Sequence, residues 1–250
     1  MLGDTSVICF SKSGIINTNS IGIFSDLVVL NNNLDTIDVE GSRCIPQGFL
    51  KKASKRIPDL HNRPAITMTA KIATLCNDSE LLYDYENRQF NFKGELLEAC
   101  LKAFAEKIGL LDENSEIRRL NRILNDRYTE VSDYYNQHYP KVRTYKFSKE
   151  RKLMSVIVGK DTLLVKGPLM IILDRCNRYL DDSDGIVKEM NTEIINKIKI
   201  VNKMWASGHN HYSCFGFAYK GLFLSGNSPK YCPIILLFIL GLSSSIFCYN

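Results

Sequence analysis

The sequence has little of what builds a metal centre or a disulfide framework. Its four histidines and eight cysteines are spread over 250 residues, and no two cysteines form a CxxC pair. Structural zinc sites and small disulfide-rich domains both need closely spaced ligands or cysteines. His209 and His211 are neighbours, but no cysteine or carboxylate stands at a ligand spacing from them. We therefore expect no metal site, and a reduced, cytosolic chain whose cysteines act as small buried apolar groups.

Charge of one sign is not in large excess either. The 32 basic residues exceed the 27 acidic ones only enough to give a net charge of +5. Such a charge suits an anionic ligand but is too small to indicate nucleic acid, so we expect no nucleic-acid partner. The hydrophobic content of 45% is that of a globular protein able to bury a core.

Long apolar runs are absent except near the C-terminus. Gly3 and Asp4 interrupt the first residues, so we expect no signal peptide. Residues 231–249, YCPIILLFILGLSSSIFCY, carry no charge and match the shortest membrane-spanning helices, which have roughly 17–25 residues. Gly241 weakens a helix there. Two interpretations stay open: a membrane anchor over residues 233–249, or a poorly folding tail.

The hydrophobic pattern changes between strand and helix periodicity along the chain. The clearest helix is 95–109, where apolar residues repeat at helical spacing before Gly109. Few strand–helix–strand units follow residue 30, which predicts an α+β fold. We expect a loop-like region over 31–65. The other elements expected are strands at 5–10, 20–30, within 143–168 (turned at Gly159) and at 214–224, and helices at 65–76, 169–179 and 186–206.

Five short segments carry a more specific signal because they occur together and in a fixed order. They are LGDTSVICFSKSGIINTN (2–19), LCNDSEL (75–81), KGELLEACL (93–101), FSKERKLMSV (147–156) and VKGPLMIILDRC (165–176). In that order they resemble the phosphorylation segment VICSDKTGTLTTN, the CND element, the GE-x-TE-x-L helix start, the FSRDRKSMSV signature and the VKGAPE…LDRC turn of P-type ATPases. Within that family the chain is most similar to calcium pumps of the sarco/endoplasmic-reticulum kind.

The resemblance implies a domain organisation and a fold. Residues 1–19 would be a remnant of the phosphorylation domain, 20–225 a nucleotide-binding domain, and 226–250 an apolar tail. The family fold for the middle part is a twisted antiparallel sheet flanked by helices, in agreement with the α+β pattern. The chain would then be a fragment, either associated with the endoplasmic-reticulum membrane or cytoplasmic.

The resemblance also implies an ATP site. Phe147 would stack on the adenine ring, Lys152 and Lys166 would place positive charge near the phosphates, and Glu98 would accept a hydrogen bond from the adenine amine. Taken alone, each of these residues has a plainer structural interpretation: a core aromatic, a charged strand end or a helix-start carboxylate. The full set implied to bind ATP is Glu95, Glu98, Phe147, Lys149, Lys152, Lys166 and Gly167.

The chain departs from the family pattern at several of these positions. Lys149 stands in place of an arginine and loses its planar fork of donors. Leu97 replaces a threonine, and Ser213 occupies the place of a phosphate-facing arginine. We therefore expect weak ATP binding, with a dissociation constant on the order of 1 mM, or about 4 kcal/mol.

The largest departure concerns the nucleophile. The family requires an aspartate where this chain has Ser11, because a carboxylate attacks the γ-phosphate to give a labile acyl phosphate. Ile15 and Asn17 also replace threonines of the same segment, and magnesium would need the missing phosphorylation domain. The sequence thus predicts a catalytically inactive ATP-binding domain. The alternatives are a non-catalytic interaction protein that regulates a full-length pump, tethered to a membrane through its tail, or a truncated product without independent function.

Overall fold

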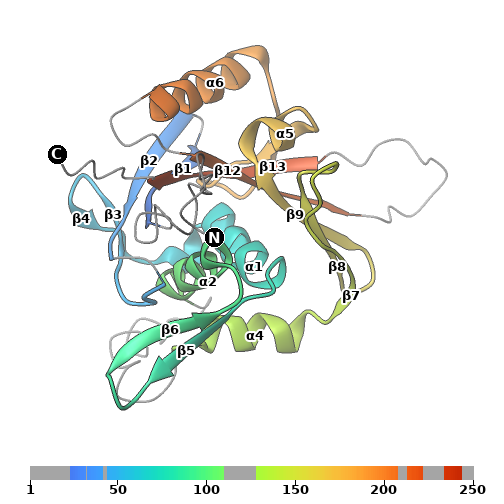
Figure 1. Cartoon of the computed structure of the whole chain (residues 1–250). Helices are drawn as coiled ribbons and strands as arrows, with labels where there is room; N and C mark the ends of the chain where they lie inside the picture. The colour runs from blue at the N-terminus through green and yellow to red at the C-terminus, as the bar shows by residue number, and fades with distance from the viewer. Residues whose placement is uncertain are drawn as a thin grey trace, which may run out of the picture.

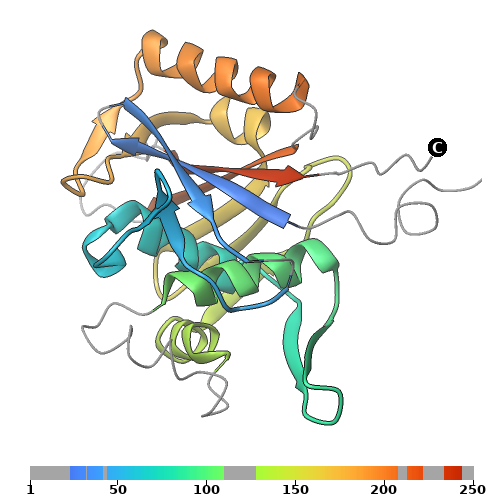
Figure 2. The same cartoon turned by 90° about the vertical axis from the view of Figure 1, so that its left-hand side faces the viewer.

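The structure, a computed structural model, describes residues 23–31, 33–41, 44–109, 128–207, 213–221 and 234–243. Within these residues one large sheet is covered by helices on both faces (Figure 1). Turned by 90°, the same molecule shows α5 and α6 over one face of the sheet and α1, α2 and α4 under the other (Figure 2). This mixed architecture, antiparallel in nearly all its strand pairs, confirms the predicted α+β fold.

The helices are α1 (Pro64–Leu75), α2 (Leu96–Ile108), α4 (Glu130–His138), α5 (Leu169–Leu173) and α6 (Thr192–Ser207), with a 3-10 turn, η1 (Leu60–Asn62). The strands are β1 (Ile23–Asn31), β2 (Asn33–Val39), β3 (Leu50–Lys52), β4 (Lys55–Arg56), β5 (Glu80–Asp84), β6 (Gln89–Lys93), β7 (Lys141–Tyr145), β8 (Met154–Val158), β9 (Thr162–Pro168), β10 (Cys176–Leu180), β11 (Val187–Glu189), β12 (Ser213–Gly221) and β13 (Ile234–Ser243).

The large sheet runs in the order β4-β3-β2-β1-β13-β12-β9-β8-β7, and β10 joins it through a parallel pairing with β13. The β7-β8-β9 meander is the set of antiparallel strands expected within 143–168, and Gly159 turns the second of its hairpins with a positive φ of 60°. β5 and β6 form a separate hairpin that projects beyond the helices (Figures 1 and 2). The meander carries the FSKERKLMSV segment, which spans the loop between β7 and β8 and the start of β8.

The apolar run near the C-terminus forms a strand over the residues that the structure describes. β13 lies between β1 and β12 and pairs antiparallel with both. Over residues 234–243 this strand differs from the membrane anchor that was one of the two open interpretations of the run. None of the described helices is long and apolar enough to span a bilayer. The physical reason for the ambiguity is that an unbroken apolar run suits a strand in the middle of a sheet as well as a membrane segment.

Two hydrophobic clusters hold the layers together, one on each face of the sheet. The larger cluster packs α1 and α2 against the sheet, with Ile66, Leu101 and Phe104 almost fully buried. The smaller cluster packs α5 and α6 on the opposite face around Leu169 and Ile198. The predicted helices 65–76 and 95–109 are confirmed as α1 and α2, and Gly109 ends α2 with a positive φ of 89°.

Three elements differ from the sequence prediction. The helix expected at 169–179 ends at Leu173, because residues 176–180 pair with β11 and β13 instead. The helix expected at 186–206 begins only at Thr192, after the short strand β11 and after Asn191, whose side-chain oxygen accepts a hydrogen bond from the Ile194 amide. The region 31–65, expected to be loop, contains β2, β3 and β4. In each case strand pairing overrides the local pattern: β2, β3, β4 and β11 pair with strands that adjoin them in the sequence, and β10 pairs also with the distant β13.

Candidate functional site

Four segments that carry the recognised motifs meet at one end of the α1–α2 layer. They are the turn 76–79 after α1, the first turn of α2, the loop 146–153 between β7 and β8, and the last residues of β9. Contacts between side chains join each segment to the next.

The centre is an ion pair between Lys166 and Glu98. Lys166 lies on β9 between Met154 of β8 and Phe217 of β12, so its side chain starts inside the sheet and is only 4% exposed. Its Nζ donates a hydrogen bond of 2.6 Å to Glu98 Oε1, at the start of α2. The second carboxylate oxygen of Glu98 accepts a bond of 2.9 Å from the Asp78 amide. The carboxylate thus fixes the position of the buried ammonium.

The CND segment forms the turn that fixes α2. Asn77 Nδ2 donates to the Ala73 carbonyl at 3.0 Å and to the Glu98 carbonyl at 2.7 Å. Burial raises the pKa of the neighbouring Cys76 thiol to about 12, and its sulfur donates to the carbonyls of Met154 and of a β9 residue at 3.6 Å. These residues therefore position the helix, and the Cys76 thiol is too weakly acidic to serve as a nucleophile.

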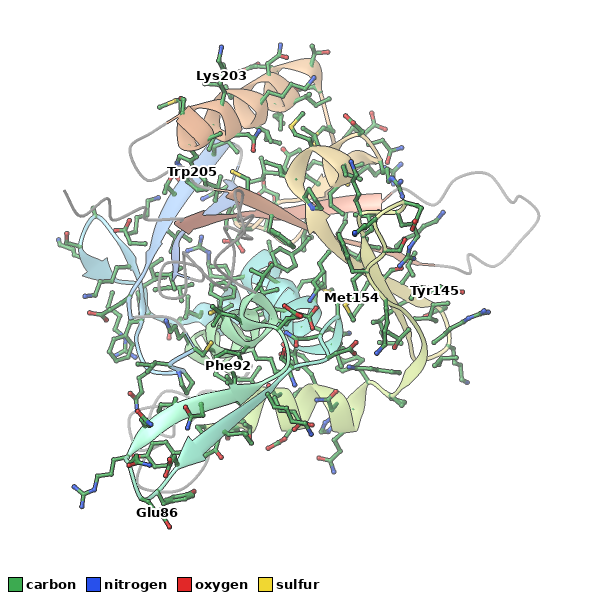
Figure 3. All side chains as sticks on the ribbon, in the orientation of Figure 1. Glu86, Phe92, Tyr145, Met154, Lys203 and Trp205 are labelled. Carbon is green, nitrogen blue, oxygen red and sulfur yellow. The ribbon has the colours of Figure 1, made fainter. Side chains whose placement is uncertain are left out.

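The loop 146–153 owes its shape to Arg151. The Arg151 guanidinium donates to the carbonyls of Tyr145 (2.7 Å), Lys146 (2.6 Å) and Leu153 (2.9 Å) and to Ser155 Oγ (3.2 Å). One planar guanidinium thus hydrogen-bonds to backbone carbonyls at both ends of the loop. This role was not predicted from the sequence. The signal that could have indicated it is an arginine in the middle of a short polar loop, with no acidic partner across the hairpin. Figure 3 shows Met154 on the side of this hairpin that faces α1 and α2, and Tyr145 on its outer side.

The loop presents Phe147 to solvent. The Phe147 side chain is 58% exposed, so it is not part of the core. Lys149 and Lys152 are exposed as well, and Lys152 has a positive φ of 56°. Gly167, on β9, faces the end of the loop so closely that a Cβ there would lie 2.9 Å from the Lys152 carbonyl oxygen and 2.5 Å from a Leu153 methyl carbon. Glycine at 167 therefore allows the loop to rest against the strand that carries Lys166.

Two further contacts bring the loop and the centre together. Lys146 Nζ lies 3.4 Å from Asp78 Oδ2, and Lys141 Nζ donates to the Asn77 carbonyl at 3.1 Å. Burial lowers the pKa of Lys141, an effect that the nearby Asp78 opposes. Lys146, which precedes Phe147 in the chain, thus contacts Asp78, and the Asp78 amide donates to Glu98. These contacts connect the loop to the buried ion pair.

The other predicted residues are less closely integrated. Glu95 directly precedes α2 with an exposed side chain that makes no capping hydrogen bond, while its carbonyl accepts one from Ser79 Oγ at 3.0 Å. Ser11 lies outside the described residues, and Ser213 is described only as a backbone position of β12. Among the described residues no group of histidine, cysteine or acidic side chains could hold a metal ion.

An exposed aromatic ring, a fixed ammonium–carboxylate pair and flanking lysines together can recognise a planar ring that bears an anionic group. Comparison with known proteins agrees with this class of site. Residues 65–230 match the family model of the P-type ATPase cytoplasmic domain N, and the chain belongs to the P-type ATPase family. Domain N is the nucleotide-binding domain of these pumps.

The individual relatives are pumps of one kind. The chain is 36% identical over 191 residues to the endoplasmic reticulum calcium ATPase srcA of Aspergillus fumigatus, which covers 74% of this chain and 20% of that protein. It is 28% identical to calcium-transporting ATPase 3, endoplasmic reticulum-type, of Arabidopsis thaliana, over 88% of this chain and 23% of the relative. The chain therefore spans about a fifth of the length of the curated relatives it matches.

Proposed function

We propose that this chain binds ATP at the site formed by loop 146–153, the start of α2 and the end of β9. The observation that carries the proposal is the exposed Phe147 ring, held on a loop that is fixed by Arg151 and whose end lies against Gly167, the residue next to Lys166. Adenine stacks on the ring, and Glu98 accepts a hydrogen bond from the adenine amine through a carboxylate oxygen. A stacked ring and a few fixed polar groups are the usual composition of a nucleotide site.

The phosphates lie toward the lysines in this arrangement. Lys152 is exposed at the end of the loop and can reach an anion freely, whereas Lys166 contributes a positive charge whose position is fixed by Glu98. Lys149 and Glu95 are exposed at the rim and act through weaker, solvent-screened interactions. Because Lys166 already has a carboxylate partner, the net attraction for phosphate is modest, which supports a dissociation constant on the order of 1 mM.

Titration of the isotope-labelled chain with ATP, followed by amide NMR shifts, tests this proposal. We expect shifts at Phe147, Lys152 and Lys166, and we expect Phe147→Ala to weaken binding about tenfold, or about 1.4 kcal/mol, because the stacking face is lost. Phe92→Ala is the matched control, since Phe92 is also a solvent-exposed phenylalanine but lies on the separate β5–β6 hairpin. Equal loss of affinity in both variants, or unmoved Phe147 resonances at several millimolar ATP, would refute the site.

We also propose that the γ-phosphate of bound ATP is not transferred to a carboxylate of this chain. Serine at position 11 cannot form an acyl phosphate, and a serine phosphoester is stable to hydroxylamine. Incubation with radiolabelled ATP is therefore expected to leave no hydroxylamine-sensitive label on the wild-type chain. A label that hydroxylamine removes would show that another carboxylate has taken over the role of the nucleophile.

The names of the relatives suggest the setting in which bound ATP is used. We propose that the site belongs to an endoplasmic-reticulum calcium pump, because both relatives described above are named as such pumps. The match covers about a fifth of those proteins, so ion transport would depend on regions to which this chain shows no match. Co-purification of the chain with a full-length calcium pump from native membranes tests whether such regions are supplied by a partner.

A further inference from the structure

Two buried cysteines from distant parts of the chain lie in contact on the far side of α2. Cys44 is on the turn that follows β2, and Cys100 is in the second turn of α2, 56 positions later. Their sulfur atoms are 3.3 Å apart. The Cys44 sulfur also lies 3.9 Å from the Leu96 carbonyl oxygen, one helical turn before Cys100. A disulfide needs a separation of about 2.05 Å, so the two sulfurs would have to approach by only about 1.3 Å.

A buried lysine shares the surroundings of this pair. Lys107, on α2, is almost fully buried and interacts electrostatically with both cysteines and with Glu40. Burial lowers its pKa to about 8, and the thiolate forms of Cys100 and Cys44 act in the opposite direction. The ground for a reaction between the two cysteines is their geometry, a sulfur–sulfur separation of 3.3 Å in a buried place.

We propose that Cys44 and Cys100 form a reversible intramolecular disulfide when the chain meets a small-molecule disulfide as oxidant. The site is distinct from the proposed ATP site and does not depend on it. None of the sequence motifs that define the family includes Cys44, and the pair is recognisable only because the fold brings β2 and α2 together.

The exchange proceeds in two balanced steps. The thiolate of Cys44 attacks one sulfur of the small disulfide, forming a mixed disulfide and releasing one small thiolate. The Cys100 thiolate then attacks the Cys44 sulfur, forming the protein disulfide and releasing the second small thiolate. The two thiol protons of the protein end on the two released thiols, and the oxidant is reduced by the two electrons that the protein loses. Cys44 reacts first because it is the more exposed of the two, at 5% against 1% for Cys100.

The disulfide would close a long ring. The segment between the two cysteines contains β3, β4, α1, β5 and β6, and it begins at the edge of the large sheet and ends in the core under that sheet. Cross-linking its ends restricts the unfolded chain much more than the folded one. We expect oxidation to raise the midpoint of thermal unfolding by on the order of 10 °C.

Peptide mapping of the full chain tests the proposal directly. The chain is equilibrated with mixtures of oxidised and reduced glutathione, alkylated, digested with trypsin without reduction and analysed by mass spectrometry. Cleavage after Arg43, Lys51, Lys93 and Lys102 separates the two cysteines into peptides 44–51 and 94–102. The expected result is a single linked pair of these peptides that disappears on addition of dithiothreitol.

Two variants separate this disulfide from unspecific oxidation. Cys44→Ser should abolish both the linked peptides and the rise in the unfolding midpoint, whereas Cys176→Ala should abolish neither. Cys176 is a suitable control because it is buried on the opposite face of the sheet, where burial raises its pKa to about 12. Cysteine peptides linked in any other pairing, or no link between 44–51 and 94–102 in a chain shown by circular dichroism to be folded, would overturn the proposal. The mapping of the wild-type chain decides the matter even if a variant fails to fold.

Discussion

Lys166→Met is expected to lower the free energy of unfolding by about 3 kcal/mol, because it leaves the Glu98 carboxylate without its charged partner in a mostly buried place. The Glu98 side chain is 17% exposed and retains only the bond from the Asp78 amide. Urea unfolding followed by circular dichroism measures the loss. Lys160→Met is the control, since Lys160 lies exposed in the β8–β9 turn and should change stability by no more than about 0.5 kcal/mol.

The double variant Lys166→Met with Glu98→Gln separates the structural role of Lys166 from its role in binding. Replacing both charged partners by neutral groups of similar size should recover most of the lost stability, since no uncompensated charge remains. ATP binding should stay at least tenfold weaker than in the wild type, because the fixed positive charge and the acceptor for the adenine amine are both missing. A double variant that binds ATP as well as the wild type would show that the ion pair only supports the fold.

The same pair shows what a sequence can and cannot predict about this site. The motifs around Glu98 and Lys166 are short and well spaced, so the sequence indicated both residues as members of one site. Their direct contact, by contrast, depends on how α2 packs against the edge of β9, and no local pattern encodes that. The resemblance described Lys166 as a charge available to phosphate, whereas in the structure its ammonium is hydrogen-bonded to the Glu98 carboxylate.

The fold, too, could be predicted only in part from the sequence. α2 was predicted almost to the residue because its apolar stripe and its terminal glycine are local signals. β13 was not, because an uninterrupted apolar run fits a buried strand and a membrane helix equally well, and only its neighbours β1 and β12 decide between them. The role of Arg151 was not predicted either, since its four acceptors are backbone and side-chain oxygens that the sequence does not mark.

The largest expected loss of folding stability concerns the N-terminus of α1, and the sequence did not indicate it. Arg63 precedes the helix and makes no capping bond with its side chain, so no local residue satisfies the first amides. Instead the fully buried Asp182, more than 100 positions later, accepts bonds from the amides of Ala65 (3.1 Å) and Ile66 (3.2 Å) and from Arg63 Nε. One carboxylate thus caps a helix and neutralises an arginine.

Asp182→Ala is therefore expected to lower the free energy of unfolding by about 4 kcal/mol, since it removes a helix cap and leaves Arg63 without its buried partner. Urea unfolding near neutral pH measures this change. Asp184→Ala, in the same turn, is the control: Asp184 is about one-third exposed and pairs with Lys188, so its loss should cost about 1 kcal/mol. Equal effects of the two substitutions would contradict the role assigned to Asp182.

The pH dependence of Asp182→Asn gives a sharper test, because asparagine keeps an oxygen acceptor but cannot ionise. Burial raises the pKa of Asp182 above its ordinary value of 3.8, although Arg63 acts against the shift. Between these two pKa values the folded chain binds more protons than the unfolded chain, so the stability due to this group falls as the pH rises. All other titrating groups are common to both proteins and cancel in the comparison. The stability advantage of the wild type over Asp182→Asn should therefore be largest near pH 4 and should shrink toward neutral pH. An advantage that grows with pH would mean that attraction to Arg63 outweighs the cost of burying the charge.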